Sequence, residues 1–457
     1  MPNYPGFEGK SDRLLDEYSI FTTMKQDGPF AVSDGVALRR HFSGESRNWA
    51  RQFNGDRLLV TKYRVVRAQI FDFLQIERFD EMQQLLVDSA LRARRSERAY
   101  RLLGSLFGIV GSTSEIRSKI KEYAQTADAV INLMRDKLLA PYAAYVETNN
   151  EIETTHDPLD LLLRVFDNRF HKKARFEAKR KLMLMNLAGA IDQRERETDI
   201  ENKFYTFLEF LNRNVWSPRL KIGELQASYL LSRHDPADFR CLDVQVITPE
   251  ARAQIGSLAP DQKLTLVKRR QFQDGERDIP VYVSVRKKNS AAKVLKLLRK
   301  NEKNPAVAVD DELGLMAVLD TISDVKRFVR HMTRSAIKGG SLMTLEDISD
   351  TLTGGGARDA RNAGSSGKTP MLKFFARMGG MRVELILHTN ASYLNYRYQR
   401  DIAHDEYEVK RIFDSGVAEF LFPGDIYSLD MKQIRQALLE QFRWNIENAG
   451  RLHGYVG

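Results

Sequence analysis

Val281-Tyr-Val-Ser-Val285 is a short run of β-branched and aromatic residues that leads directly into Arg286-Lys-Lys288. A run of this composition is typical of a β-strand. The residues that follow, from Ala291 to Lys300, carry leucines at helical spacing. This stretch therefore predicts a strand followed by a helix, with a group of cations where the two meet.

Similar runs recur before and after this stretch, and helical segments lie between them. They are Asp243 to Ile247, Leu264 to Val267, Leu315 to Leu319 and Val383 to Leu387, with a helical pattern from Ile322 to Thr333. Strands that alternate with helices are typical of domains with helices packed on a sheet. We predict a mixed-sheet domain over residues 221–430.

The N-terminal half is predicted to be mostly helical, because apolar residues recur there at three- and four-residue spacing. Ser112-Thr-Ser-Glu115 has the pattern of a capping box and predicts a helix start before the run from Ile116 to Leu139. A polar stretch at 148–158 suggests a break, and 431–449 reads as a closing amphipathic helix. The predicted fold class is α+β, with a helical domain at 1–220, the sheet domain at 221–430 and a C-terminal helix and tail at 431–457.

The composition excludes several classes of protein. With 457 residues, 42% apolar, 29% charged and 9% aromatic, the chain is neither wholly disordered nor a collagen-like fibre. The longest apolar stretch, from Leu102 to Val110, is too short to span a bilayer, so we expect no membrane partner. The single cysteine, Cys241, cannot form an internal disulfide, and we expect a cytoplasmic protein.

The chain is basic, with 71 Lys and Arg against 61 Asp and Glu and a net charge of +10. A positive surplus favours anionic partners such as nucleic acids and nucleotide phosphates. Seven basic side chains cluster in one helical segment: His171, Lys172, Lys173, Arg175, Lys179, Arg180 and Lys181. This segment is either a solvated helix face or an RNA-contacting surface.

Two short segments resemble a phosphate-binding loop and a metal-binding motif, but each lacks residues that such a site requires. Gly364-Ser-Ser-Gly-Lys-Thr369 resembles the end of a P-loop, but Asn362 occupies the place of the first glycine and no strand leads into it. His156 and His234 each begin a His-Asp dipeptide, and no convergent set of further ligands accompanies either. We therefore predict structural roles for these histidines.

A more informative pattern combines cations with two carboxylates. Lys293 and Lys296 extend the cationic group along one helix face, and Asp311 precedes an apolar strand. Glu384 stands alone inside the apolar run Val383-Glu-Leu-Ile-Leu387, where an unpaired carboxylate would be costly to bury. Carboxylates beside a cationic cradle suit Mg²⁺-assisted phosphoryl or pyrophosphoryl transfer, although a solvent-facing Glu384 is the alternative.

Four segments, in order, resemble the motifs of the synthetase domain of the RelA/SpoT family, the enzymes that make the alarmone (p)ppGpp. They are Arg286 with Lys288 and Lys296, Asp311-Glu-Leu-Gly314, Glu384-Leu-Ile-Leu-His-Thr389, and Ala403-His404-Asp-Glu-Tyr407. The resemblance covers residues 280–415, and each piece is short. It implies a nucleotidyltransferase fold.

The resemblance also implies an activity: transfer of the β,γ-diphosphate of ATP to a ribose hydroxyl of a nucleotide or an RNA acceptor such as tRNA. Its residue assignments are Asp311 and Glu384 as catalytic residues and Mg²⁺ ligands, Arg286, Lys288 and Lys296 at the ATP phosphates, Lys368 in the acceptor loop, and Gly314, Thr389, His404 and Tyr407 as signature residues.

The chain departs from the family pattern at several positions. Ala292 replaces a serine, Met316 replaces the arginine that packs on the donor adenine, Ile386 replaces a glutamine, and Lys368 stands where a tyrosine stacks on the acceptor base. These departures leave two other classes open. One is a catalytically impaired fold that binds nucleotide or RNA as a regulatory module, and the other is a structural interaction protein.

Overall fold

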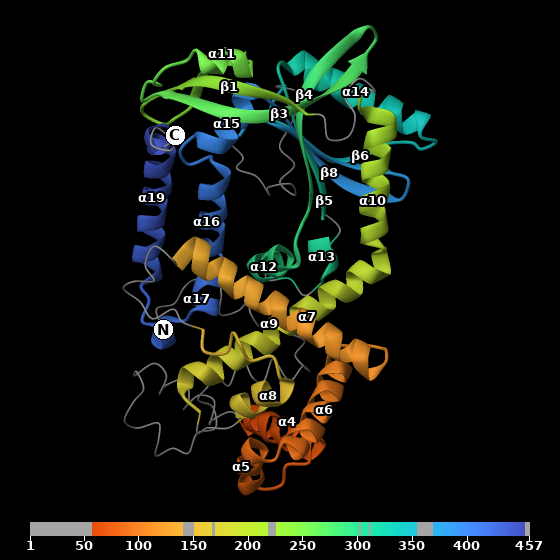
Figure 1. Cartoon of the computed structure of the whole chain (residues 1–457), viewed down its shortest axis with the longest axis vertical. Coiled ribbons are helices and arrows are strands. Elements are labelled where there is room, and N and C mark those ends of the chain that lie inside the picture. The colour runs from red at the N-terminus through yellow and green to blue at the C-terminus, as the bar shows by residue number, and fades with distance from the viewer. Residues whose placement is uncertain are drawn as a thin grey trace. The chain divides into compact units, whose positions relative to one another are not determined.

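The computed structural model describes residues 57–139, 150–166, 170–217, 225–300, 302, 304–309, 312–353 and 369–452. These residues form two compact units, and each unit combines segments that are far apart in the sequence (Figure 1). The first holds the described residues of Met1–Arg194, Asn289–Ala308 and Ile412–Ile434, and the second holds those of Glu195–Lys288, Val309–Arg411 and Arg435–Gly457.

The predicted consecutive domains 1–220, 221–430 and 431–457 do not coincide with these units. Helix α12 (Ser290–Lys300) packs against α7 (Thr113–Met134) in the first unit, although the predicted boundary assigns it to the sheet domain. Residues 195–217 belong with the sheet. Contacts between segments distant in sequence decide the units, and the composition of consecutive segments does not reveal such contacts.

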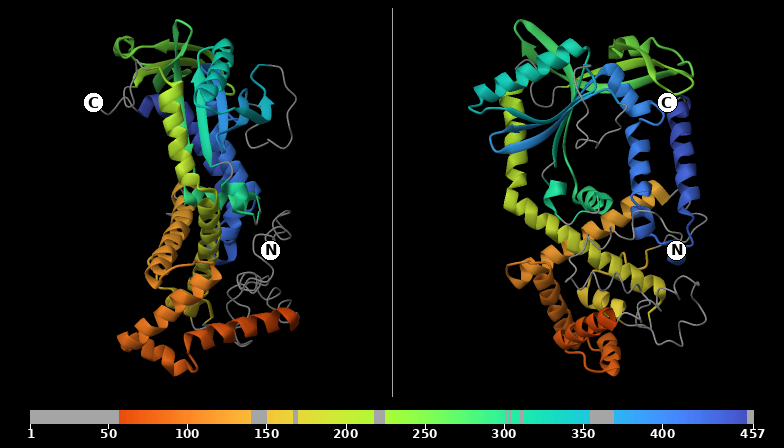
Figure 2. Two further views of the ribbon diagram at one scale, coloured as in Figure 1. Left: turned by 90° about the vertical axis from the view of Figure 1, so that its right-hand side faces the viewer. Right: turned by 180° about the vertical axis from the view of Figure 1, so that it is seen from behind.

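The second unit is built on an eight-stranded mixed sheet with the order β2-β1-β3-β4-β5-β8-β7-β6 (Figure 2). The strands are β1 (Gln226–His234), β2 (Cys241–Ile247), β3 (Gln262–Asp274), β4 (Arg277–Lys287), β5 (Leu313–Leu319), β6 (Thr344–Asp350), β7 (Leu372–Met378) and β8 (Met381–Thr389). Neighbouring strands are antiparallel except β5 and β8, which run parallel. The combination of helices with a mixed sheet confirms the α+β class.

The central strands β5 and β8 are buried on both faces, because successive side chains point to opposite sides. On one face Leu315 and Leu385 pack in a core with Phe328 of α14 (Ile322–Lys338). On the other face Val318 packs with Tyr393 of α15 (Asn390–Tyr398). We call the two sides of the sheet the α14 face and the α15 face, after the helix that packs on each.

The remaining helices of the second unit flank this sheet. They are α10 (Ile200–Phe210) with the π-helix η5 (Leu211–Val215), α11 (Pro249–Ala253), most of α16 (His404–Asp414) and most of α19 (Met431–Leu452).

The first unit is helical in its described residues. Besides α7 and α12 it contains α4 (Arg57–Leu74), α5 (Phe79–Val87), α6 (Ser89–Leu106), the π-helix η3 (Arg135–Leu139), α8 (Pro158–Phe166), most of α9 (Lys172–Thr198), α13 (Ala306–Val309), α17 (Val417–Leu421) and α18 (Gly424–Tyr427). The predicted capping box at the start of α7 is present, with Ser112 and Glu115 bonded reciprocally. None of the described helices has the length and apolarity needed to cross a membrane.

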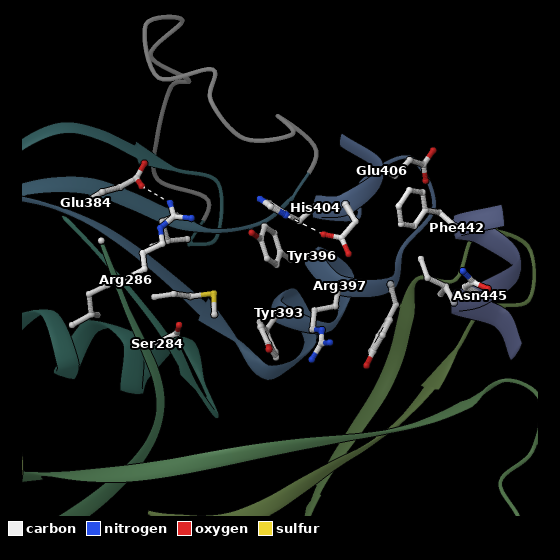
Figure 3. A pocket seen from close by; sticks show the side chains of 17 residues that line it. Ser284, Arg286, Glu384, Tyr393, Tyr396, Arg397, His404, Glu406, Phe442 and Asn445 are labelled. Carbon is white, nitrogen blue, oxygen red and sulfur yellow. Dashed lines mark hydrogen bonds and ion pairs between the residues drawn. The ribbon is translucent and has the colours of Figure 1, made fainter. Parts of the chain in front are cut away.

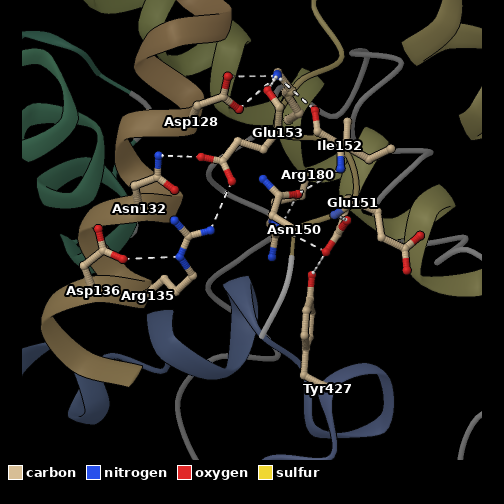
Figure 4. Close-up of polar contacts among 12 residues, drawn as sticks. Asp128, Asn132, Arg135, Asp136, Asn150, Glu151, Ile152, Glu153, Arg180 and Tyr427 are labelled. Carbon is tan, nitrogen blue, oxygen red and sulfur yellow. Dashed lines mark hydrogen bonds and ion pairs between the residues drawn. The ribbon is translucent and has the colours of Figure 1, made fainter. Parts of the chain in front are cut away.

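The basic segment at the start of α9 is not the exposed surface that either sequence interpretation required. Lys173, Arg175, Arg180 and Lys181 are buried within the first unit. Lys181 donates to Asp128 Oδ2 at 2.9 Å and to the carbonyls of Ile152 and Glu153 at 3.2 and 3.1 Å (Figure 4). An extended RNA surface on this segment is therefore excluded for the buried cations, which instead hold the unit together.

Arg180 and its neighbour Glu177 anchor a distant part of the same unit. Arg180 donates to the carbonyl of Leu421 at 2.5 Å, and Tyr427 donates to Glu177 at 2.6 Å. Because all four residues are buried or carry buried polar atoms, these bonds are made away from water and are costly to break. They tie the segment with α17 and α18 to α9.

Candidate functional site

A cavity of about 520 Å³ opens on the α15 face of the sheet (Figure 3). Its walls come from six elements of the second unit: Ser284 and Arg286 of β4, Gly314 to Met316 of β5, Glu384 and Ile386 of β8, Tyr393, Tyr396, Arg397 and Tyr398 of α15, His404 to Glu406 of α16, and Phe442, Asn445 and Ile446 of α19. One end holds the charged side chains of Arg286 and Glu384, and the other end combines aromatic rings with charged side chains. A cavity of this size accommodates a nucleotide-sized ligand.

The charged end is a row of three residues on three adjacent strands. Arg286 of β4 is the partner of Gly314 of β5, and Gly314 is the partner of Glu384 of β8. The Arg286 side chain crosses over Gly314, and its Nη2 atom donates to Glu384 Oε2 at 2.9 Å. Three of the predicted site residues, separated by as many as 98 positions in the chain, thus meet at one place.

Gly314 makes this crossing possible. A Cβ atom at position 314 would lie 3.0 Å from Arg286 Nε and 3.3 Å from its Cγ, closer than ordinary contacts allow. A side chain at this position would displace the guanidinium from its place above the strand. Glycine is therefore required here because it leaves room for the Arg286 side chain. Its backbone conformation is one that other residues can also adopt.

We expect Gly314→Val to lower the free energy of unfolding by about 1–3 kcal/mol, because the added side chain displaces the guanidinium from Glu384 and overpacks the strand. The measurement is urea unfolding. Gly256→Val is the control, since a Cβ at Gly256 would meet nothing within 4 Å. Equal unfolding free energies in the two variants would contradict this role for Gly314.

Glu384 is a buried carboxylate held between cations. Its Oε1 atom lies 3.0 Å from Lys373 Nζ, and its Oε2 atom accepts from Arg286. Burial alone would raise the pKa of Glu384, but Lys373, Arg286 and Lys288 outweigh it and hold this pKa below its ordinary value. A carboxylate that stays ionised is suited to holding cations, and it is a poor general base near neutral pH. The alternative of a solvent-facing Glu384 is wrong.

Lys373, which sequence reasoning missed, is the other half of this arrangement. It lies on β7 opposite Ile386 of β8, and its side chain is buried. Strand β7 (Leu372–Met378) carries two cations, of which Arg377 is exposed and Lys373 lies in its apolar part, and Glu384 is the single carboxylate of β8. A cation and a carboxylate within two successive, largely apolar strands could have suggested this pairing, because a buried charge requires a partner.

The other predicted phosphate ligands are distributed differently. Lys288 follows β4 in the second unit and lowers the pKa of Glu384. Lys296 belongs to the first unit, where its Nζ atom donates to the carbonyl of Val307 at 2.5 Å. Lys296 and Arg286 thus belong to different units, and one partner of the Lys296 ammonium group is a backbone carbonyl of its own unit.

The predicted signature residues have identifiable local roles. Thr389 caps α15, where its hydroxyl accepts from Ser392 N at 3.3 Å. His404 lines the cavity, and its ring lies 5.2 Å from the ring of Tyr396. Tyr407 lies one turn further along α16, with Arg411 above its ring. Asp311 and Lys368 lie outside the described residues.

The opposite end of the cavity combines aromatic rings with Arg397, Asp405 and Glu406. Tyr393, Tyr396 and Tyr398 of α15 line it together with Phe442 of α19, and Figure 3 shows the labelled rings away from Glu384. Arg397 lies above the rings of Tyr393 and Tyr398 at 5.9 and 5.4 Å. Burial raises the pKa of Tyr393 to about 12, so its hydroxyl stays protonated. This end offers ring faces to a planar base and protonated hydroxyls to its edge.

His388 lies on the same face of β8 as Glu384 but is completely buried behind the cavity wall. Its Nδ1 atom lies 2.9 Å from the Ser392 hydroxyl, and burial lowers its pKa to about 4. Below the ordinary histidine pKa of about 6.5, this side chain is protonated in the unfolded chain, but in the folded protein it stays neutral down to about pH 4. Stability should therefore fall as the pH falls from about 6.5 towards 4.

We expect His388→Gln to remove about 2 kcal/mol of the loss in unfolding free energy between pH 7 and pH 4.5. The measurement is urea unfolding at a series of pH values. His404→Gln, which changes a histidine with a 41% exposed side chain, is the variant for comparison. A His388→Gln variant that loses stability as steeply as the parent would contradict the assignment.

The described residues contain no group of three or more His, Cys, Asp or Glu side chains placed to hold a metal. Mg²⁺ is commonly held by one or two carboxylates together with substrate phosphates. Glu384 supplies one carboxylate, and Arg286, 47% exposed, is able to turn from it towards a phosphate. The described residues thus fit a metal that arrives with a nucleotide and do not form a metal centre of their own.

No protein-family model matches the chain, and no curated protein matches it with significance. The chemistry of the cavity is therefore inferred from the residues that line it.

Proposed function

We propose that the chain is a RelA/SpoT-like pyrophosphokinase that transfers the β,γ-diphosphate of ATP to a ribose hydroxyl of a nucleotide or RNA acceptor. One observation carries the proposal. Segments singled out by the resemblance, at Arg286, Gly314, Glu384 and His404, line the same cavity although they lie on separate elements. Residues that belonged to unrelated structural roles would have no reason to converge there.

The two ends of the cavity suit the two parts of ATP. Arg286, with Lys288 nearby, faces the polyphosphate, because guanidinium and ammonium groups bind phosphate oxygens well. The tyrosines of α15 face the base, and Met316 lines the wall between them. Tyrosine faces here take over the contact with adenine that an arginine makes in the family.

The reaction forms one bond and breaks another. The acceptor hydroxyl oxygen bonds to the β-phosphorus of ATP, the bond from that phosphorus to the α,β-bridging oxygen breaks, and AMP leaves. The hydroxyl proton passes to solvent. Arg286 and Lys288 neutralise charge on the transferred group, and Glu384 keeps these cations in place. Mg²⁺, when bound through Glu384 and Asp311, supplies further neutralisation of phosphate charge.

One observation favours a second candidate, a nucleotide-binding module without turnover. Both oxygens of Glu384 are engaged by cations, so a metal must displace Arg286 before it reaches the carboxylate. A site that keeps this ion pair when ATP binds holds the nucleotide and does not transfer its phosphates.

The test is incubation of the protein with γ-labelled ATP, Mg²⁺ and separate acceptors: guanosine nucleotides, adenosine nucleotides and bulk tRNA. Labelled acceptor together with stoichiometric AMP supports pyrophosphoryl transfer. ATP binding without any labelled acceptor supports the binding module, and no ATP binding rejects both. Arg286→Gln should abolish the signal, whereas Arg277→Gln, an exposed arginine at the other end of β4, should preserve it.

A further inference from the structure

Helix α14 exposes a row of four cations, Lys326, Arg330, Arg334 and Lys338, which we call the cationic stripe. They follow one another at four-residue spacing, so they lie on one broad side of the helix. All four side chains are exposed, and that of Arg334 is 63% exposed. The stripe is about 18 Å long at a rise of about 1.5 Å per residue.

The opposite side of α14 is committed to the interior. Val325, Phe328, Met332 and Ala336 are buried in the core between α14 and the sheet. The stripe therefore cannot turn inward. The only large apolar side chains of α14 that are exposed are Ile322 and Ile337, near its two ends, so the helix lacks the continuous free apolar face that a membrane-surface helix requires. The stripe presents charge to solvent on a rigid support.

The cations of the stripe are poorly neutralised. Arg334 has Asp274 at 3.8 Å, whereas Lys326, Arg330 and Lys338 form no ion pair with any residue that the structure describes. In α9, in contrast, Lys173, Arg180 and Lys181 are buried and paired with carboxylates of the first unit. Unpaired, exposed cations in a row are complementary to a row of phosphates, about five of which lie along 18 Å of one nucleic-acid strand.

We propose that the cationic stripe of α14 binds the phosphodiester backbone of nucleic acid without reading its sequence. The stripe lies on the α14 face of the sheet, and the cavity opens on the α15 face. Binding at the stripe is therefore independent of the proposed reaction, and its loss leaves ATP binding in the cavity unchanged.

The experiment compares the full-length parent with a variant that carries Lys326→Gln, Arg330→Gln, Arg334→Gln and Lys338→Gln. The probes are a 20-base-pair RNA duplex and a DNA duplex of the same sequence, titrated at several salt concentrations by fluorescence anisotropy. Each lost phosphate contact should reduce the slope of log affinity against log salt by about 0.9. For four contacts we expect a reduction of about 3.6 in total, together with unchanged ATP affinity and unchanged melting temperature.

The matched control removes four exposed cations elsewhere: Arg101→Gln, Lys121→Gln, Arg233→Gln and Arg240→Gln. Both variants lose the same net charge, so a parental slope in the control assigns the effect to the stripe. The proposal is overturned if the parent binds neither duplex, or if the stripe variant keeps the parental slope. It is also overturned if the two variants lose binding equally, or if the stripe binds phosphatidylserine vesicles and neither duplex.

Discussion

Glu384→Gln is expected to reduce the proposed pyrophosphoryl transfer about a hundredfold or more while the proposed ATP binding persists. Glutamine keeps the shape of the side chain but removes the negative charge that holds Lys373 and Arg286 and that would meet a metal. Removing a group that stabilises charge in a transition state costs factors of this size. The measurement is the rate of labelled product formation under saturating ATP.

The control for this variant must separate chemistry from folding, because Lys373 is left buried beside a neutral partner. Glu346→Gln changes another carboxylate that is paired with two arginines, Arg377 and Arg382, outside the cavity. It should keep the parental rate. If Glu384→Gln lowers the melting temperature, the double variant Glu384→Gln/Lys373→Met restores a neutral interior and should remain inactive. Parental turnover in a folded Glu384→Gln protein would show that the carboxylate has no part in the reaction.

Lys181→Met is expected to lower the free energy of unfolding by about 3–5 kcal/mol, the usual cost of breaking a buried ion pair from one side. Lys181 uses its ammonium group on Asp128 and on two backbone carbonyls in the interior of the first unit. Burial lowers the pKa of Lys181 and raises that of Asp128, as expected for two charges removed from water together. Chemical denaturation at pH 7 measures the effect.

The same experiment distinguishes a buried pair from a solvated basic face. Lys121→Met changes an exposed lysine of α7 in the same unit and should cost less than about 1 kcal/mol. Replacing both members of the pair, as Lys181→Met/Asp128→Leu, should recover most of the loss because no charge is then buried alone. A cost for Lys181→Met as small as that for Lys121→Met would place this lysine in water.

Much of the secondary structure could be predicted from local patterns. The runs at 243–247, 281–285 and 383–387 lie within β2, β4 and β8, and the helices expected at 291–300 and 322–333 are α12 and the first part of α14. Three strands have no predicted counterpart: β1, β6 and β7. Strand β6 (Thr344–Asp350) is polar and lies at the sheet edge. An edge strand lacks the buried alternation that makes a strand recognisable.

The sequence did not indicate which cations of α9 and α14 are buried and which are exposed. The sequence predicts a basic face on the segment at 171–181 and only a helix at 322–333. In the structure, however, four of the basic side chains of α9 are buried, and the four cations of the stripe on α14 are exposed. Both helices carry lysine and arginine at similar density, so composition cannot separate them. What differs is the partner: α9 meets carboxylates and carbonyls of its own unit, and the charged side of α14 meets water.

Local sequence therefore determined where strands and helices form and which residues of β4, β5 and β8 were chemically unusual in their strands. The spacing of apolar side chains and the capping of helix ends depend on residues a few positions apart, so both can be recognised in a short stretch of sequence. Only the tertiary structure decided that Arg286 crosses Gly314 to Glu384, that Lys373 completes the pair, and that Lys181 is internal. Strand register and helix packing set these contacts between residues tens of positions apart, and the low polarity of the interior makes each of them costly to leave unpaired.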